Sequence, residues 1–404
     1  MGSLPFDGLT VLEYAGFIAG PYCAKLLADL GARVVKIEPP GAGDPARSYG
    51  PFPGDIPDKE KSGLFLYLSS NKLSVTLDPK TPAGRDLFTR LASKAGLLVE
   101  DTEPGTMAEL GLDYATLREA NPGLVYVSIT PYGQNGPKAH WKAHHINTFH
   151  AAGEGYALPG GLSHATFPDR APITGGAHMG EYDAALMAAS AAVAALFARE
   201  AWGLGQHVDV SKQEATLAVN RLAQALYLGH GVISDKSRHY DYGGLYPCKD
   251  GYVNLFPRED HQWQALTEVM GRPDLAESEI FRARAARIEH GDEVNAIVAG
   301  WAATLTKSEI YQRVAPTRCP ASPFATPEEV VNSPQMEARR FFLEVHHPKV
   351  GTLQHPSQPY RFSVSQDTQR RPAPLLGQHN EEVLCGDLGL EPEELAGLRR
   401  GGVV

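Results

Sequence analysis

Short apolar runs alternate with stretches of helical spacing along the first third of the chain. Apolar runs at residues 9–14 and 33–38 flank a stretch at 22–30 that has helical periodicity and stops at Gly31. The same alternation predicts further strands at 73–78, 97–101 and 124–130 and further helices at 82–95 and 109–120. Strand, glycine turn, helix and strand in this order predict an α/β fold with one doubly wound layer over about the first 130 residues.

The pattern changes after this layer. Residues 133–180 are rich in Gly, Pro, His and Asn with weak periodicity, and such a long irregular stretch is usually functional. An Ala-rich run at 184–198 predicts a buried helix opening near Glu181. The run is shorter than the roughly 18 residues of a membrane span, so no membrane association is expected.

The second half predicts a separate, smaller α+β domain. Its expected elements are a strand at 251–256 and helices at 261–271 and 289–301. A later helix near 380–388 is expected in the tail that returns to the first domain. The expected organisation is a large Rossmann-like domain at 1–224, a small domain at 225–330 and a return to the large domain at 331–404.

The composition of the chain argues against several classes of function. The 404 residues carry a formal net charge of −10, and 43% of them are hydrophobic. An acidic chain without a basic run is not expected to bind nucleic acid. The N-terminus lacks a basic region followed by an apolar stretch, so no secretory signal is expected. Four scattered cysteines (Cys23, Cys248, Cys319 and Cys385) favour a reducing cytoplasm.

Five stretches in order along the chain resemble the family III CoA transferases, the family of formyl-CoA transferase, the carnitine CoA-transferases and 2-methylacyl-CoA racemase. They are GLTVLEYAGFIAGPYCAKLLADLGARVVKIEPPGAGDPAR, SNKLSVTLD, PGTMAELGLDYATLREANPGLVYVSITPYGQNGP, GLGQHVDVSKQEA and PAPLLGQHNEEVL. The resemblance implies a Rossmann-like large domain made from both chain ends, a small domain between them and an interlocked homodimer. It also implies a coenzyme A thioester as substrate, with no tightly bound cofactor.

The resemblance implies a catalytic carboxylate at the start of the helix after the long loop. Counted back from Ala195-Leu196, the position of the family's Asp is occupied here by Glu181, one methylene longer. A carboxylate at a helix N-terminus can attack an acyl-CoA thioester and pass CoA to a second carboxylic acid, and Glu serves this chemistry as well as Asp. CoA transfer between two acids with Glu181 as covalent carboxylate is therefore the preferred hypothesis.

Two alternatives stay open at this stage. The racemases of the family use a His in a GHDxN motif, and the matching AHHIN places His144 at that His, with Glu259 matching a supporting carboxylate. His144, Glu181 and Glu259 would then exchange the α-proton of a 2-substituted acyl-CoA. The other alternative is a non-catalytic subunit that supports an active paralogue in a mixed dimer.

The resemblance further implies a set of CoA-binding residues. They are Ala19, Gly20, Lys36, Asn71, Lys72, Met107, Gln134 and Lys138. The chain departs from the family where an arginine usually precedes Pro-Gly, because Glu103 stands there. Either Lys138 or Lys142 compensates for this lost phosphate partner, or the chain binds CoA weakly.

Two further sets of residues bear on acid binding and on metal binding. Four arginines are candidates to pair the substrate's second carboxylate: Arg170, Arg221, Arg238 and Arg258. The histidine-rich loop (His140, His144, His145 and His150) shows no HExxH spacing, and no metal site is expected from it.

Overall fold

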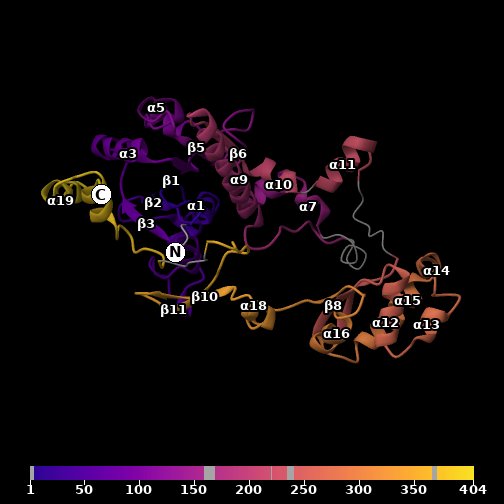
Figure 1. Ribbon diagram of the computed structural model, residues 1–404. Helices are drawn as coiled ribbons and strands as arrows, with labels where there is room; N and C mark the ends of the chain where they lie inside the picture. Colours follow the sequence, from indigo (N-terminus) through magenta and orange to yellow (C-terminus); the bar gives the residue numbers. More distant parts are fainter. Residues whose placement is uncertain (1–3, 159–168, 220, 234–240, 366–370) are drawn as a thin grey trace. The chain divides into compact units, whose positions relative to one another are not determined.

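The computed structural model describes residues 4–158, 169–219, 221–233, 241–365 and 371–404. The chain divides into two compact units. The first contains Met1–Tyr156, Ile173–Val232 and Arg339–Val404, and the second contains Ala157–Pro172 and Ile233–Ala338. Both ends of the chain therefore belong to the first unit, as Figure 1 shows.

A six-stranded sheet in the order β3-β2-β1-β4-β5-β6 forms the centre of the first unit. All neighbouring pairs are parallel. The strands are β1 (Thr10–Tyr14), β2 (Arg33–Glu38), β3 (Lys72–Thr76), β4 (Leu97–Glu100), β5 (Val125–Thr130) and β6 (His207–Ser211). This confirms the expected Rossmann-like α/β class. The strand order reverses between β1 and β4, and in open parallel sheets ligands bind at such a switch point, beyond the carboxyl ends of the strands.

The sixth strand corrects the expectation that the layer ends near residue 130. β6 joins the sheet only after the long irregular stretch and helix α9 (Met179–Trp202), and it pairs with β5 from Tyr126↔His207 to Thr130↔Ser211. The sequence HVDVS has the alternation of an edge strand, but it stands far from the other strands along the chain. The whole segment between β5 and β6 is thus one long crossover connection.

Helices cover both faces of the sheet because the strands alternate their buried side chains. Val34 packs under α1 (Ala19–Asp29) and α9, whereas Val35 packs on the opposite face. Small alanines on α9 allow close packing against α1, and the rings of Tyr22 and Tyr182 lie 4.9 Å apart at the start of the two helices. The opposite face is covered by α3 (Pro82–Lys94), α5 (Tyr114–Ala120), the π-helix η3 (Glu381–Asp387) and α19 (Pro392–Arg400).

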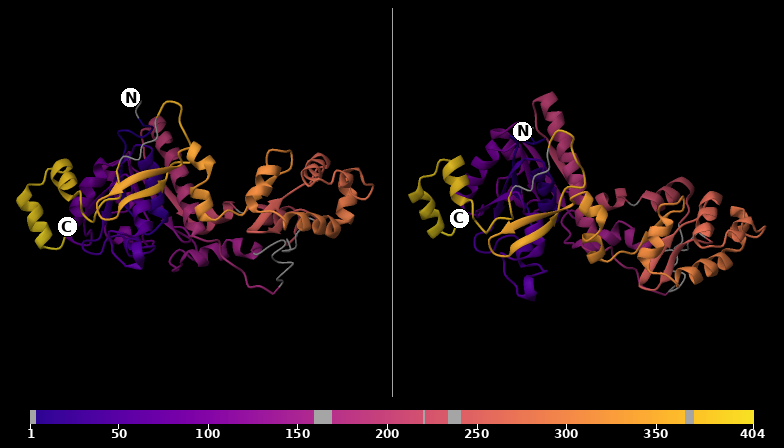
Figure 2. Two further views of the ribbon diagram at one scale, coloured as in Figure 1. Left: turned by 90° about the horizontal axis from the view of Figure 1, so that it is seen from below. Right: turned by 60° about the horizontal axis from the view of Figure 1, so that its bottom comes forward.

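The C-terminal segment completes the core of the first unit. Val383, Leu384 and Leu395 are buried in the same cluster as Val35 and Val75 of the N-terminal strands. In Figure 2 the yellow C-terminal helices accordingly lie beside the indigo and purple elements. A two-stranded antiparallel hairpin of β10 (Phe342–His347) and β11 (Gly351–Pro356) precedes them.

Three helix predictions differ from the structure. The helix expected at 109–120 is two helices, α4 (Thr106–Glu109) and α5, because Gly111 between them has a left-handed φ of 68°. The helix expected at 22–30 begins earlier, at Ala19, since Pro21 fits a first helical turn. The helix expected near 380–388 has the wider π-helical turn of η3.

The second unit is a small α+β unit with the antiparallel sheet β7-β8-β9. Its strands are β7 (Gly244–Cys248), β8 (Gly251–Leu255) and β9 (Ala321–Pro323). Its helices are α12 (Asp260–Val269), α13 (Asp274–Glu277), α14 (Arg284–Glu289), α15 (Gly291–Ala302), α16 (Lys307–Val314), α17 (Pro327–Val331) and α18 (Pro334–Ala338). The fully buried Trp263 lies in its core with Leu255 and Val298.

The remaining helical elements lie mainly in the connections of the first unit. They are α2 (Gly63–Leu68), α6 (His145–Ala151), α7 (Glu154–Ala157), α10 (Lys212–Val219), α11 (Arg221–His230) and the 3-10 helices η1 (Pro45–Ser48) and η2 (Pro53–Asp55). Among the described helices, α9 has the length and hydropathy of a membrane span, with a mean hydropathy of 1.4. Its alanine face packs in the core of the first unit, which is the usual reason for such composition in a core helix.

Candidate functional site

Glu181 lies in the first turn of α9, at the carboxyl edge of the sheet. The helix returns the chain from the end of β5 to the start of the parallel strand β6, so its N-terminus must lie above the carboxyl ends of the strands. The residue is 5% exposed. The positive end of the helix dipole favours a carboxylate at this position.

Lys212 is the cation paired with Glu181. Its Nζ donates a hydrogen bond of 2.7 Å to Glu181 Oε2, and the two side chains are only 16% and 6% exposed. Lys212 is the first residue of α10 and directly follows β6, so the sheet edge fixes its position. The pair is therefore largely shielded from water, unlike a surface ion pair.

Asp101 brings a second carboxyl group to the same edge. It follows β4 and accepts hydrogen bonds from the backbone N–H of Gly16, at 3.0 Å and 3.2 Å to its two oxygens. Burial raises the pKa of Asp101 to about 7, although the Lys212 ammonium acts in the opposite direction. The bond joins the loops after β1 and β4, the two strands that flank the switch point.

Left-handed residues other than glycine gather where the loop after β1 meets the start of α9. Phe17, Ala177 and His178 have φ values of 63°, 54° and 58°. The rings of Phe17 and His178 lie 5.2 Å apart, and His178 Nε2 is 2.9 Å from the Tyr49 hydroxyl. Such conformations cost free energy and cluster at functional sites, so they mark this contact independently of Glu181.

The structure brings His145, and not His144, to the start of α9. His145 is buried, with its Nδ1 3.2 Å from the position that a Cβ on Gly180 would occupy. Burial lowers the pKa of His145, whereas the backbone of Gly175 and the Glu181 carboxylate raise it. His144 is exposed at the N-terminus of α6, where its N–H donates to Asn147 Oδ1. Buried residues on α6 recur as His145, Thr148 and Phe149, a helical spacing that could have indicated the inward histidine.

Two of the expected CoA-binding lysines, Lys36 and Lys72, support the backbone between the end of β1 and the start of α1. Lys36 and Lys72 are fully buried. Lys36 Nζ lies 2.6 Å from Glu13 Oε1, pairs with Asp44 and donates to the carbonyl of Ala15 at 2.9 Å. Lys72 Nζ lies 2.7 Å from Glu13 Oε2 and donates to the carbonyl of Pro21 at 2.7 Å. Lys36 therefore holds the backbone of the loop, and Lys72 holds the first turn of α1. The expectation that Lys36 lies near phosphates does not fit its complete burial between carboxylates.

The buried cluster shifts the pKa values of its members. Burial alone would lower the pKa of Lys36, but Asp44 and Glu13 raise it above the ordinary value. Burial lowers the pKa of Lys72 to about 8, with Glu13 acting in the opposite direction. Burial opposes ionisation of Glu13, yet the two lysines hold its pKa below the usual range.

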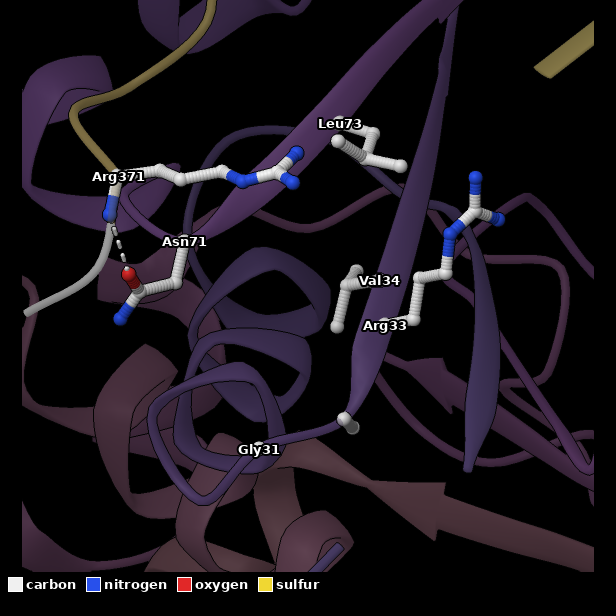
Figure 3. A pocket seen from close by; sticks show the side chains of 7 residues that line it. Gly31, Arg33, Val34, Asn71, Leu73 and Arg371 are labelled. Carbon is white, nitrogen blue, oxygen red and sulfur yellow. Dashed lines mark hydrogen bonds between the residues drawn. The ribbon is translucent and has the colours of Figure 1, made fainter. Parts of the chain in front are cut away.

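Three more residues of the expected CoA-binding set are also buried: Ala19, Gly20 and Asn71. A Cβ on Gly20 would lie 2.2 Å from the Cβ of Ala15, so only glycine permits this close approach of α1 to the loop. Asn71 precedes β3, and Figure 3 shows it bonded through its Oδ1 to the backbone of Arg371. With Arg33 it lines a cavity of about 260 Å³ at the amino ends of β2 and β3, away from the carboxyl edge that carries Glu181.

Met107 and Gln134 line one pocket that begins at the end of β4 and runs beside β5 and the first residue of β6, next to α5. The pocket has a volume of about 230 Å³, and Glu103 and Tyr126 also line it. The Ser128 hydroxyl lies 2.9 Å from His207 Nε2 at its wall.

The two lysines expected to compensate for the negative charge of Glu103 differ in their positions. Lys142 Nζ lies 3.5 Å from Glu103 Oε1, and both side chains are exposed. Lys138 lies instead over the rings of Tyr132 and Trp141, at 5.9 Å and 5.4 Å from their centroids. An exposed pair of this kind contributes little, so Glu103 keeps a negative charge near the pocket.

Glu259 belongs to the second unit. It is the N-cap of α12, and its carboxylate lies 3.3 Å from Arg284 Nη1 at the surface. Arg258 in the same unit lies over the ring of Phe256. Arg238, another candidate to pair the substrate's second carboxylate, lies outside the described residues.

Sequence reasoning missed Lys212 and Asp101, although Lys212 stood in one of the stretches that carried the resemblance and Asp101 lies three residues before another. Each follows a strand directly, and polar residues after parallel strands meet at one edge of the sheet, which is the signal that could have found them. Among the described residues, no group of three or more His, Cys, Asp or Glu is placed to hold a metal ion.

Comparison with known proteins assigns this arrangement to a family. The CoA-transferase family III model matches residues 6–380. The chain is 34% identical to succinyl-CoA–D-citramalate CoA-transferase of Chloroflexus aurantiacus, over 99% of this chain and 98% of the relative. It is 32% identical to the beta subunit of succinyl-CoA–L-malate CoA-transferase of the same species, over 100% and 98%. A CaiB/BaiF family protein from Brucella suis superposes with a TM-score of 0.84 at 27% identity, covering 95% and 99% of the two chains.

The fold and the matches define a CoA transferase built on a Rossmann-like α/β domain. The chain belongs to CoA-transferase family III. The family and the enzyme class expected from the five stretches are therefore confirmed.

Proposed function

We propose that the protein moves CoA from an acyl-CoA to a carboxylic acid with Glu181 as the covalent carboxylate. The observation that carries this proposal is the position of Glu181. It is a nearly buried carboxylate at a helix N-terminus on the carboxyl edge of the sheet, 2.7 Å from Lys212 Nζ. Such a group is shielded from water, ion-paired and close to the switch point where a ligand enters.

The reaction then proceeds in two matching halves. A Glu181 oxygen attacks the thioester carbonyl, the C–S bond breaks and CoA leaves as thiolate, which gives a mixed anhydride. The thiolate attacks the Glu181 carbonyl carbon, the C–O bond breaks and the first acid leaves as carboxylate, which gives an enzyme-bound CoA thioester. The second acid reverses these steps and leaves as its own CoA thioester. None of these steps uses water, and water would hydrolyse the anhydride and the thioester. The site must therefore exclude it.

CoA is expected to extend from Glu181 across the switch point. Met107 and Gln134 share the pocket beside β4 and β5, and we assign part of the CoA molecule to it. Ile18, the N-cap of α1, makes no side-chain capping hydrogen bond, so the first N–H groups of α1 can stabilise a developing oxyanion. Ala19 and Gly20 contribute through this backbone. Lys36 and Lys72 contribute through the backbone that they support, and Lys138 remains a candidate for the nucleotide phosphates.

A dicarboxylic acid is the proposed acceptor class. The relative at 34% identity is named for succinyl-CoA and D-citramalate, both of which carry a second carboxylate. We propose a succinyl-type donor and a four- or five-carbon dicarboxylic acid as the first pair to assay.

We further propose that two copies of the chain form an interlocked homodimer in the cytoplasm. Large apolar side chains are exposed on α9 and α11, where Phe197 and Leu228 are 79% and 83% exposed. Faces of this kind mark interaction sites. A mixed dimer with a paralogue is the alternative, because the L-malate relative is named as a beta subunit. Sedimentation of the purified chain as a monomer at micromolar concentration would contradict the homodimer.

Mass analysis of the covalent intermediate tests the proposed chemistry. Incubation with succinyl-CoA alone should add the mass of CoA less one water to the peptide containing Glu181 and release one equivalent of succinate. Glu181→Gln should show neither. CoA transfer by the wild type at normal rates with no adduct at Glu181, at any quenching time, would overturn the proposal. A wild type that neither transfers CoA nor forms the adduct alone would favour the non-catalytic subunit.

A further inference from the structure

The net charge of the Glu181–Lys212 pair changes during the proposed reaction. When Glu181 becomes an anhydride or a thioester it is neutral, and Lys212 then loses the anion that it contacts at 2.7 Å. The Lys212 side chain is only 16% exposed. Breaking a buried ion pair by removing one partner is strongly unfavourable, because the other charge stays behind without compensation. Another anion must therefore approach Lys212 during the reaction, or the covalent states would be poorly populated.

Asp101 is a second carboxyl group whose charge interacts with Lys212. It is already engaged, since both of its oxygens accept from the N–H of Gly16. Burial also raises its pKa to about 7, so this carboxyl group holds its proton more readily than an ordinary carboxylate and is a poor replacement for the Glu181 carboxylate. His145, from α6, carries no negative charge in either protonation state and so supplies no anion.

We propose that Lys212 is the carboxylate-binding residue of the acid site. It pairs with Glu181 in the resting enzyme and with the substrate acid's reacting carboxylate in the enzyme–CoA thioester. This inference rests on the proposed function, because it requires Glu181 to be acylated.

The balance of charge follows the reaction at each stage. In the resting enzyme, the anion beside Lys212 is Glu181. In the anhydride, both carboxylates are consumed and the CoA thiolate carries the negative charge. In the thioester, the released acid carries the charge, and the second acid replaces it before attacking the Glu181 carbonyl. Lys212 therefore has an anionic partner at each chemical step, and the acid is held beside the carbon that it must attack.

The position of Lys212 fits this task. It is anchored where β6 ends and α10 begins, on rigid elements that pack against α9. Its flexible side chain can follow a carboxylate over the short distance between Glu181 and an incoming acid.

The first test measures binding of succinate to variants that cannot react. Glu181→Gln removes the resting anion and leaves Lys212 to the ligand, so it should bind succinate about tenfold or more tightly than the wild type in calorimetry. The double variant Glu181→Gln with Lys212→Met should lose this gain. Equal succinate affinity for the wild type and Glu181→Gln would overturn the proposal.

The second test follows the two half-reactions of Lys212→Met. It should still form the CoA adduct at Glu181 from succinyl-CoA, but the isolated adduct should need about tenfold to hundredfold more acid for half-maximal discharge. Lys212→Arg should recover part of the loss, and Lys80→Met, an exposed lysine beyond the opposite edge strand, should behave as the wild type. An unchanged acid dependence in Lys212→Met would refute the role of Lys212. Absence of the adduct in a wild type that transfers CoA would instead refute the covalent role of Glu181, so the two failures are distinguishable.

Discussion

The backbone N–H of Gly16 donates to the carboxyl group of Asp101, and this bond joins the two loops on either side of the switch point. The carboxyl group is buried, and burial raises its pKa to about 7, well above its ordinary value. A raised pKa in the folded state means that folding favours the protonated form. The contribution of Asp101 to stability is thus complete below about pH 4 and is lost as the pH rises through 7.

Asp101→Asn should remove this pH dependence, because the amide keeps an acceptor for Gly16 but does not titrate. The free energy of unfolding of the wild type, relative to that of Asp101→Asn, should fall between pH 5 and pH 8. Urea denaturation of both proteins at several pH values measures the difference, in which other titrating groups cancel. A constant difference over this range would show that the carboxyl group is already ionised at pH 5.

Gly20→Ala should distort the start of α1. The added Cβ would lie 2.2 Å from Ala15 Cβ and 3.4 Å from Asp101 Oδ2, so the backbone must shift at the site. Overpacking of this kind costs about 1–3 kcal/mol, and CoA affinity should fall as well. Gly300→Ala, where the added Cβ meets no atom within 4 Å, is the matched control and should be neutral or slightly stabilising. Denaturation midpoints and CoA titrations of the two variants make the comparison.

Lys36→Met should be among the most destabilising substitutions outside the apolar core. It leaves the carboxylates of Glu13 and Asp44 buried with less compensation, which costs about 3–5 kcal/mol. Lys80→Met is the control, because Lys80 is exposed. Thermal unfolding of both variants is the measurement. If Lys36→Met retained wild-type stability but bound CoA weakly, Lys36 would be a phosphate contact after all.

Glu181→Asp should reduce the rate although it introduces the residue usual in the family. The shorter side chain withdraws the carboxylate by about 1 Å, and such misplacement can cost about a hundredfold in rate. Glu181→Gln should lose nearly all turnover with the fold intact. Initial rates with succinyl-CoA and one dicarboxylic acid rank the three proteins. A gain of activity in Glu181→Asp would support a degenerate partner subunit.

His144 and His145 separate the transferase from the racemase alternative. If an α-proton is exchanged, a 2-methylacyl-CoA should take up deuterium from D₂O without any acceptor acid. We expect no uptake, and His144→Ala should keep CoA transfer within about twofold because the side chain is exposed. His145→Ala should reduce transfer, since His145 packs against the start of α9. Deuterium uptake that disappears in His144→Ala would establish the racemase reaction.

The apolar pattern alone determined most of the Rossmann-like layer. Five of the six strands were predictable because each lies in a short apolar run bounded by turn residues or by a helical stretch, and β2 was predicted with its observed bounds. β6 was not, since a strand contributed after a long crossover is recognised only when its partner strand is known. The resemblance of five stretches identified the family, and counting along one helix located Glu181.

The tertiary structure alone decided which side chains meet at that carboxylate. Whether a lysine binds a phosphate or lies buried under a loop depends on neighbours far away in the sequence: Lys36 meets Asp44 and Glu13, and Lys212 meets Glu181. Likewise, His144 and His145 are adjacent in the chain, and only the packing of α6 on α9 turns His145 inward. Local patterns record the periodicity of a helix or strand, whereas the partners of a charged or polar side chain are set by how those elements pack.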